Sequence, residues 1–200
     1  MGLFDNIDNI ENTNGLDNAY KSIEKEIYEY ISANYVSWWN KPIPKKNLKI
    51  RFEDGKIIVD CLETVKVYNA LLRSLQNDLF EWGEINGGFY AEYCIYLENL
   101  KGAPKIVNGC FSCRACYPLK SLEGAPEKVC SFNCTYCKRL KNLEHISQNI
   151  TYGLSCNECD ELESFYGCPK EIGGPIEYSD CPKLKDLSHK PICNRKEFNQ

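Results

Sequence analysis

Pairs of cysteines separated by two residues recur in the second half of this 200-residue chain, and such pairs are typical zinc ligands. Three successive pairs are Cys113 and Cys116, Cys134 and Cys137, and Cys156 and Cys159. Seventeen residues separate the first pair from the second, a spacing found in zinc ribbons. A zinc-binding module that uses these six side chains is therefore one hypothesis.

The cysteine pairs are part of a longer repeat of 21 or 22 residues. One unit begins at Leu119 and reads LKSLEGAPEKVCSFNCTYCKR. Each complete unit has a leading leucine, a second leucine or a phenylalanine three positions later, and a β-branched residue ten positions later. The leading leucines are Leu97, Leu119, Leu140, Leu162 and Leu184. A fixed period of this length is typical of a solenoid, whose units bury their apolar columns by stacking on one another.

The cysteines keep phase with the leucines, because they stand six and three positions before each leading leucine. Ala91 and Tyr178 replace the first cysteine in two units, so this position accepts other fairly apolar side chains. The second position is cysteine in every unit, namely Cys94, Cys116, Cys137, Cys159 and Cys181. Free cysteine behaves as a small hydrophobe. We therefore expect a ladder of buried thiols between coils, with no cofactor.

The repeat resembles the leucine-rich repeat, in which a short strand leads to a ladder residue that is asparagine or cysteine. The segment FNCTYC, residues 132–137, matches the strand and its ladder position. The segment SLEGAPEKV, residues 121–129, is similar to leucine-rich-repeat-like proteins of tailed bacteriophages. The resemblance spans residues 60–192 and implies a mainly β solenoid. Two residues instead of one follow the ladder cysteine, and a Gly-x-Pro turn comes later, so we expect no helix on the return side, which is either a second strand or irregular.

The N-terminal region is expected to cap the first coil with a helix and a hairpin, over residues 17–60. An amphipathic helix with Asp17 as its N-cap is predicted by the spacing of Tyr20, Ile23, Ile27, Ile31, Tyr35 and Trp38. Alternating apolar residues around Asp54 and Gly55 predict a two-residue hairpin. We expect a flexible N-terminus at 1–16, a repeat solenoid at 61–193 and a tail at 194–200. A homodimer mate is one candidate cover for the last coil.

Composition and motifs argue against several classes of function. The net charge of -4 does not favour a nucleic-acid partner. The sequence contains no phosphate-binding glycine loop, HExxH motif or nucleophile elbow, so we expect no enzyme. His145 and His189 occupy a turn position that is glycine in other units, which indicates a structural role. Without a signal peptide or a membrane span we expect a cytoplasmic protein with reduced thiols.

The remaining candidate site is a surface for another protein. Residues between the buried columns of an open stack point outward side by side, and tyrosine, tryptophan and arginine are favoured at binding hot spots. The expected binding residues are Tyr90, Glu92, Tyr93, Ser112, Arg114, Asn133, Thr135, Tyr136, Ser155, Asn157, Glu177 and Ser179 on the strand face, with Trp38 and Trp39. The bacteriophage resemblance implies a host defence protein as the partner, inhibited in the host cytoplasm as by an anti-CRISPR protein. A phage virion structural or decoration protein is the alternative.

Overall fold

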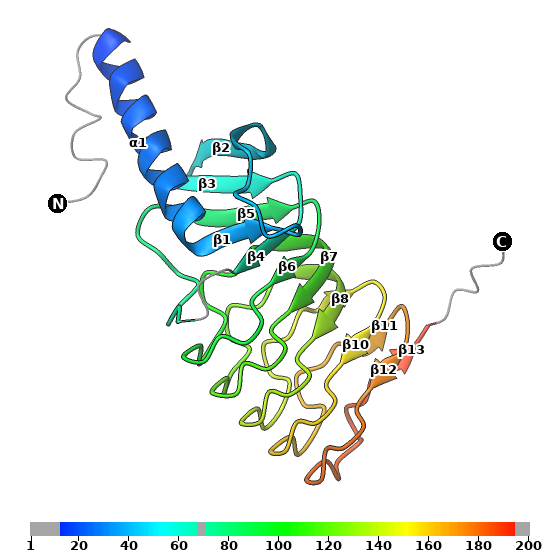
Figure 1. The fold of residues 1–200 in the computed structure, drawn as a ribbon. Coiled ribbons are helices and arrows are strands. Elements are labelled where there is room, and N and C mark those ends of the chain that lie inside the picture. Colours follow the sequence, from blue (N-terminus) through cyan, green and yellow to red (C-terminus); the bar gives the residue numbers. More distant parts are fainter. Residues whose placement is uncertain (1–12, 68–70, 195–200) are drawn as a thin grey trace.

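Coils of the chain stack in sequence order to form a parallel β-solenoid of about six turns, with about 22 residues in each turn. The computed structural model describes residues 13–67 and 71–194. One helix, α1 (Thr13–Asn34), lies at the start of the stack, and the later coils continue away from it (Figure 1). The expected flexible N-terminus lies outside the described residues over 1–12, and so does the expected tail over 195–200.

The strands are short because each coil turns after a few residues. The N-terminal elements after α1 are β1 (Tyr35–Ser37), the 3-10 helix η1 (Lys45–Asn47), β2 (Leu48–Glu53), β3 (Lys56–Cys61) and β4 (Val65–Val67). The strands that follow are β5 (Glu81–Ile85), β6 (Phe89–Tyr90), β7 (Ile106–Ser112), β8 (Lys128–Asn133), β9 (Asn149–Ile150), β10 (Leu154–Ser155), β11 (Glu171–Ile172), β12 (Ile176–Glu177) and β13 (Ile192–Cys193).

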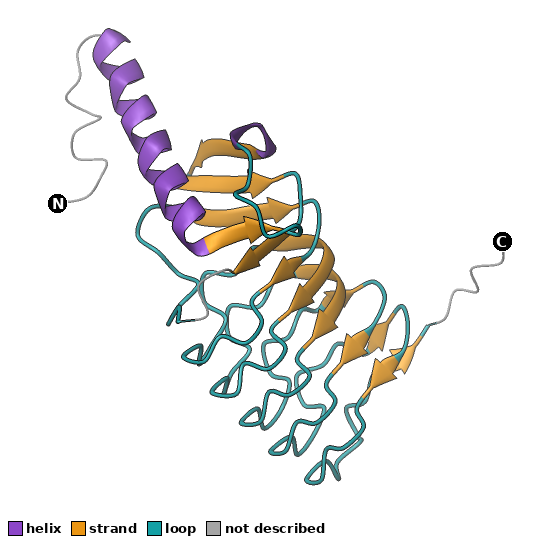
Figure 2. Ribbon diagram, in the orientation of Figure 1, coloured by secondary structure: helices purple, strands orange, loops and turns teal. Residues whose placement is uncertain are grey.

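Each coil has two sides with strands and one irregular side. On the first side β4, β6, β7, β8, β10 and β12 follow one another in parallel. On the second side β5, β7, β8 and β9 pair in parallel, and β11 pairs with β13. β7 and β8 run through the bend between the two sides (Figure 2). The described residues of the repeat contain no helix, as expected, and the return side forms a short second strand at the β-branched column.

The apolar columns predicted from the repeat are buried in the internal coils. Leu119, Leu140 and Leu162 are at most 1% exposed. Phe89 and Phe111, one coil apart, stack with ring centroids 5.9 Å apart and an interplanar angle of 4°. Stacking therefore removes whole columns from water, which is the main source of stability in such a fold.

The N-terminal segment packs on the first coil through an apolar face of α1, where Ile23, Ile27 and Ile31 are buried. The predicted hairpin is confirmed, because β2 and β3 pair antiparallel with Glu53 opposite Lys56. β3 then pairs in parallel with β5, so the hairpin extends the second side of the solenoid.

The predicted boundaries of the helix were wrong at both ends. α1 begins at Thr13, so Asp17 lies inside the helix and is not its N-cap. α1 ends at Asn34, and Tyr35 starts β1, which pairs antiparallel with β4. Tyr35 and Trp38 are therefore not part of the helix. The aromatic and β-branched residues that follow Asn34 favour a strand, and this strand pairs with Val65–Val67.

Two positions of the repeat adopt left-handed backbone, one in every coil and the other in all but the last coil. The glycine position has φ of 88° at Gly102 and 90° at Gly124, and His145 shares it with φ 68°. His189 has no positive φ, so the predicted turn conformation is confirmed for His145 and wrong for His189. The residue before each ladder cysteine also has positive φ, namely Tyr93, Ala115, Tyr136, Glu158 and Asp180. These residues turn the chain away from the first side.

Candidate functional site

The residues predicted to form a binding face lie side by side on the first side of the solenoid. Parallel pairing places Tyr90 opposite Ser112, Ser112 opposite Asn133, and Asn133 opposite Ser155. Glu177 continues this line on β12. Figure 1 shows β6, β7, β8, β10 and β12 as one row of arrows. We call this surface the strand face, and it consists of Tyr90, Glu92, Tyr93, Ser112, Arg114, Asn133, Thr135, Tyr136, Ser155, Asn157, Glu177 and Ser179.

Many polar groups of the strand face bind one another across coils. The Ser155 hydroxyl donates to a Glu177 carboxylate oxygen over 2.8 Å, and the Ser179 amide donates to Asn157 Oδ1 over 2.8 Å. The Ser112 hydroxyl donates to Glu92, and Ser112 is 0% exposed. Ser112 keeps the register of the strand face, but it is covered by neighbouring side chains and its hydroxyl is bound to Glu92. Thr135 is also buried, at 9% exposure.

A row of aromatic and cationic side chains lies along the edge of the strand face where the chain turns away. The Arg114 guanidinium is 6.0 Å from the ring centroid of Tyr93 and 5.4 Å from that of Tyr136. The Lys138 ammonium is 5.5 Å from the same Tyr136 ring and forms an ion pair with Asp160 at 2.8 Å. Cation–π contacts hold these long side chains over rings on successive coils.

Trp38 connects the N-terminal segment to this row. The Trp38 and Tyr90 ring centroids are 5.3 Å apart, and the Lys66 ammonium is 5.0 Å from the Trp38 ring. Trp38 is 50% exposed and its neighbour Trp39 is 78% exposed. The two candidate regions, the strand face and the tryptophans, therefore meet. We call Trp38, Trp39, Lys66, Tyr90, Tyr93, Arg114, Tyr136 and Lys138 the aromatic–cationic row.

Sequence reasoning missed Lys66 and Lys138 as members of this row. The repeat pattern could have placed Lys138, because it directly follows a ladder cysteine and so lies at the turn beside Tyr136. No local signal could have placed Lys66, because its contact with Trp38 depends on the pairing of β1 with β4. Other exposed apolar residues at the same turns are Ile95, Tyr96 and Tyr117.

Four of the five ladder thiols bind backbone carbonyl groups of the preceding coil, and the Cys94 thiol donates to the Glu92 carbonyl of its own coil. The thiols of Cys116, Cys137, Cys159 and Cys181 donate to the carbonyl oxygens of Ala91, Cys113, Cys134 and Cys156 over 2.9, 3.3, 3.2 and 3.1 Å, respectively. The six proposed zinc ligands are thus distributed over three coils. Within residues 18–67 and 71–194, no three His, Cys, Asp or Glu side chains are grouped so that they could hold a metal ion.

The chemistry of the buried thiols follows from their surroundings. Burial raises the pKa of Cys61 to about 11 and that of Cys168 to about 12. Hydrogen bonding to the Cys159 sulfur, and then burial, raises the pKa of Cys134. Because the thiolate is the nucleophile, buried thiols with raised pKa values are unreactive near neutral pH.

His189 lies next to a serine and near a carboxylate, an arrangement that superficially suggests catalysis. The Ser188 hydroxyl is 2.9 Å from His189 Nδ1, and Asp186 accepts a hydrogen bond from the Ser188 amide over 2.9 Å. In a catalytic triad the carboxylate binds the histidine and orients it, whereas here the serine lies between the two. All three residues are exposed in one turn, which fits a local turn interaction.

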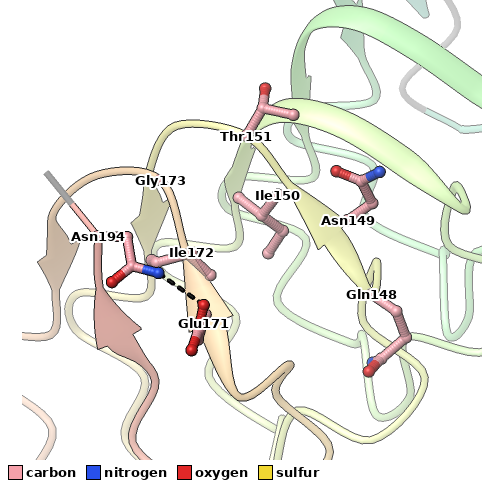
Figure 3. Close-up of a pocket in the computed structure, with 8 residues that line it drawn as sticks. All are labelled: Gln148, Asn149, Ile150, Thr151, Glu171, Ile172, Gly173 and Asn194. Atoms are coloured by element: carbon pink, nitrogen blue, oxygen red, sulfur yellow. Dashed lines mark hydrogen bonds between the residues drawn. The ribbon is translucent and has the colours of Figure 1, made fainter. Parts of the chain in front are cut away.

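A cavity of about 350 Å³ opens on the second side, between β9 and β11. Figure 3 shows Ile150 and Ile172 there, surrounded by polar side chains, with Asn194 donating to Glu171 over 2.6 Å. Its described lining residues are Gln148, Asn149, Ile150, Thr151, Glu171, Ile172, Gly173 and Asn194. Glu171 is the one carboxylate among them, so this lining has no acid–base pair.

Comparisons with known proteins give no relative. No protein-family model matches the chain. No curated protein matches it. No solved structure matches it. In the described part of the chain, no helix has the length and apolar character needed to cross a membrane.

Proposed function

We propose that this protein is a non-enzymatic repeat scaffold that binds another protein through the aromatic–cationic row and the adjoining strand face. The observation that carries the proposal is the contact between Trp38 and Tyr90, which joins the exposed tryptophans to a row of tyrosines and cations. Tryptophan, tyrosine and arginine are the residue types that most often dominate binding energy at protein interfaces.

The rigidity of the scaffold supports this proposal. The backbone next to the row is bonded to a neighbouring coil, for example from the Tyr93 amide to the Arg114 carbonyl over 3.0 Å and from the Tyr136 amide to the Asn157 carbonyl over 2.9 Å. A partner would therefore meet side chains on a preformed backbone, which lowers the entropic cost of binding. The acidic net charge of -4 favours a protein partner over a nucleic acid.

The resemblance to leucine-rich-repeat-like bacteriophage proteins supplies the identity of the partner in this proposal. A phage-encoded solenoid would act in the host cytoplasm and inhibit a host defence protein, in the way an anti-CRISPR protein does. The repeated leucines and the unbroken cysteine column support the leucine-rich-repeat part of this resemblance.

The test measures capture of a partner from bacterial host lysate by immobilised wild-type protein and by two variants. Arg114→Glu removes the cation between Tyr93 and Tyr136, and Trp38→Ala removes the contact with Tyr90. We expect each variant to reduce binding of the captured protein, then purified, by about tenfold or more, since hot-spot truncations cost about 2 kcal/mol.

Two matched controls lie away from the row. Lys105→Glu makes the same charge change as Arg114→Glu at an exposed site in another part of a coil. Tyr152→Ala removes an aromatic ring that is 50% exposed, as Trp38 is. Full binding by both test variants, or equal losses in the controls, would show that the row is not the binding site.

A further inference from the structure

The last described coil, residues 176–194, leaves its apolar columns open on one side. Leu162 and Phe165, in the coil before it, are both 0% exposed. Leu187, which continues the column of Phe165, is 47% exposed, and Leu184, which continues that of Leu162, is only partly buried. Ile176, Tyr178 and Cys181 are partly buried as well. In internal coils the next coil covers these apolar columns. In the last described coil the same columns are partly exposed at the end of the stack.

The two ends of the stack differ in this respect. At the first end, Ile57, Val59 and Cys61 of β3 are buried together with residues of α1. At the last end, β12 has one strand neighbour, β10, and β13 has one, β11. Figure 1 shows α1 and the hairpin beside the first coils, and β12 and β13 at the opposite end of the stack.

The last coil also has unused backbone donors. In the preceding coil the Cys156 amide donates to the Glu177 carbonyl and the Glu158 amide donates to the Ser179 carbonyl, both over 2.8 Å. One coil later the corresponding amides belong to Tyr178 and Asp180, and they have no acceptor among the described residues. A row of unpaired amides at a strand edge is a template for another strand.

The charge of this end is balanced. Residues 176–194 contain three carboxylates, Glu177, Asp180 and Asp186, and three lysines, Lys183, Lys185 and Lys190. Their net charge is zero with His189 neutral, although the whole chain carries -4. Two copies of this end can therefore approach each other with little net repulsion, and carboxylates of one can meet lysines of the other.

From these observations we propose that the last coil is a homodimer interface, at which a second copy of this chain stacks end to end through the same coil. A two-fold axis would place β12 antiparallel to β12 of the partner subunit and join the apolar columns of the two stacks. Such an interface is self-complementary, because each copy supplies both the columns and the strand edge that the other copy needs. It is independent of the aromatic–cationic row and of any partner bound there.

The test is the molar mass of the full chain in solution, measured by light scattering during size-exclusion chromatography at low salt. We expect wild-type protein to have twice the monomer mass of 23.0 kDa. Leu187→Glu places a charge in the open column. The double variant Lys183→Glu and Lys185→Glu changes each end from zero to -4 through exposed residues. We expect both variants to raise the dimer dissociation constant by about tenfold or more.

The matched control is Lys120→Glu with Lys141→Glu, which makes the same charge change in internal coils. It uses the position that Lys185 occupies in the last coil, and it should remain dimeric. Circular dichroism checks that the solenoid is intact in each variant, and the lysine double variant tests the interface even if Leu187→Glu unfolds the last coil. A monomeric wild-type protein would overturn the proposal and would mean that other parts of the same chain cover this end. A control variant whose dimer dissociates as readily as that of the test variants would also overturn it.

Discussion

The thiol of Cys159 donates a hydrogen bond to the main-chain oxygen of Cys134, one coil earlier, over 3.2 Å. The donor stands at the second cysteine position of its unit and the acceptor at the first. A backbone carbonyl is available whatever side chain the first position carries, which explains why Ala91 is tolerated there: its carbonyl accepts from the Cys116 thiol. The second position must supply a small donor, and it is cysteine in all the units.

Replacing Cys159 should therefore cost more stability than replacing Cys156 in the same coil. Both side chains are 0% exposed, but only Cys159 has a hydrogen bond from its thiol in the described structure. We expect Cys159→Ala to lower the free energy of unfolding by about 0.5–1.5 kcal/mol beyond the effect of Cys156→Ala, because the Cys134 carbonyl loses one of its two hydrogen bonds and keeps the one from the Cys137 amide. Urea denaturation under reducing conditions measures both. Equal losses would mean that the thiol acts only by filling space.

The thiols should differ widely in their reactivity toward a soluble disulfide reagent. Eight of the thirteen cysteines are buried, namely Cys61, Cys94, Cys113, Cys116, Cys134, Cys137, Cys156 and Cys159, and Cys193 is exposed. We expect Cys193 to react first in native protein and the eight to react only after denaturation, because the reagent cannot reach buried sulfur atoms. Mass spectrometry of the labelled peptides identifies the order. Rapid labelling of the eight in folded protein would contradict the stacked structure.

Chelators should leave the stability of the protein unchanged. The ladder thiols donate to backbone carbonyls in successive coils, as Cys137 does to Cys113 and Cys159 does to Cys134. A structural zinc site would instead hold thiolates at about 2.3 Å from one ion and would unfold when the metal is removed. We expect the same urea midpoint with and without EDTA, and no zinc in freshly purified protein by elemental analysis. Stoichiometric zinc with chelator-induced unfolding would favour the zinc module.

The repeat was readable from the sequence because stacking imposes one requirement on every coil. A residue such as Leu140 must fill the same space as Leu119, so the period, the buried columns and the order of coils follow from spacing. The hairpin around Asp54 and Gly55 was readable because its turn chemistry is local. The positions of the strand face also follow, since parallel register repeats once per coil.

Contacts between segments that are distant in the sequence could not be predicted from the sequence. The spacing of Ile31, Tyr35 and Trp38 fits a helix, and pairing with Val65–Val67 decides that Tyr35 enters a strand. The meeting of Trp38 with Tyr90 depends on that pairing. In the same way, the register of Ser112 predicts an exposed side chain, yet the side chain is buried and its hydroxyl donates to the Glu92 carboxylate of the previous coil. These contacts depend on tertiary packing, which cannot be predicted from the propensities of the local sequence.

The stability of the solenoid should fall in alkaline solution. Burial raises the pKa of Cys61 to about 11 and that of Cys168 to about 12, whereas an unfolded thiol has a pKa of about 8.5. A group whose pKa is higher in the folded state contributes its full stability below the unfolded pKa, and it loses that stability as the pH rises through the folded pKa. Each thiol then lowers the free energy of unfolding by up to about 1.4 kcal/mol per pH unit between these values.

Urea denaturation under reducing conditions between pH 8 and pH 11 measures this slope. Cys168→Ala should make the decrease shallower, because one thiol that titrates differently in the two states is gone. Cys193→Ala is the control, since Cys193 is exposed. A stability that stays constant over this range would show that the buried thiols titrate as in the unfolded chain.

The glycine position of the coils can be tested with two substitutions to alanine. Gly124 has φ 90°, and a Cβ built there would lie 2.5 Å from both the N and Cα atoms of Lys101. His145 holds the same repeat position with φ 68° and already carries a side chain. We expect Gly124→Ala to lower the free energy of unfolding by more than about 2 kcal/mol, through left-handed strain and overlap with backbone. His145→Ala should change it by less than about 1 kcal/mol, since its backbone already accommodates a Cβ. Thermal and urea unfolding measure both variants, and similar losses at the two sites would mean that close approach of the coils does not set the glycine requirement.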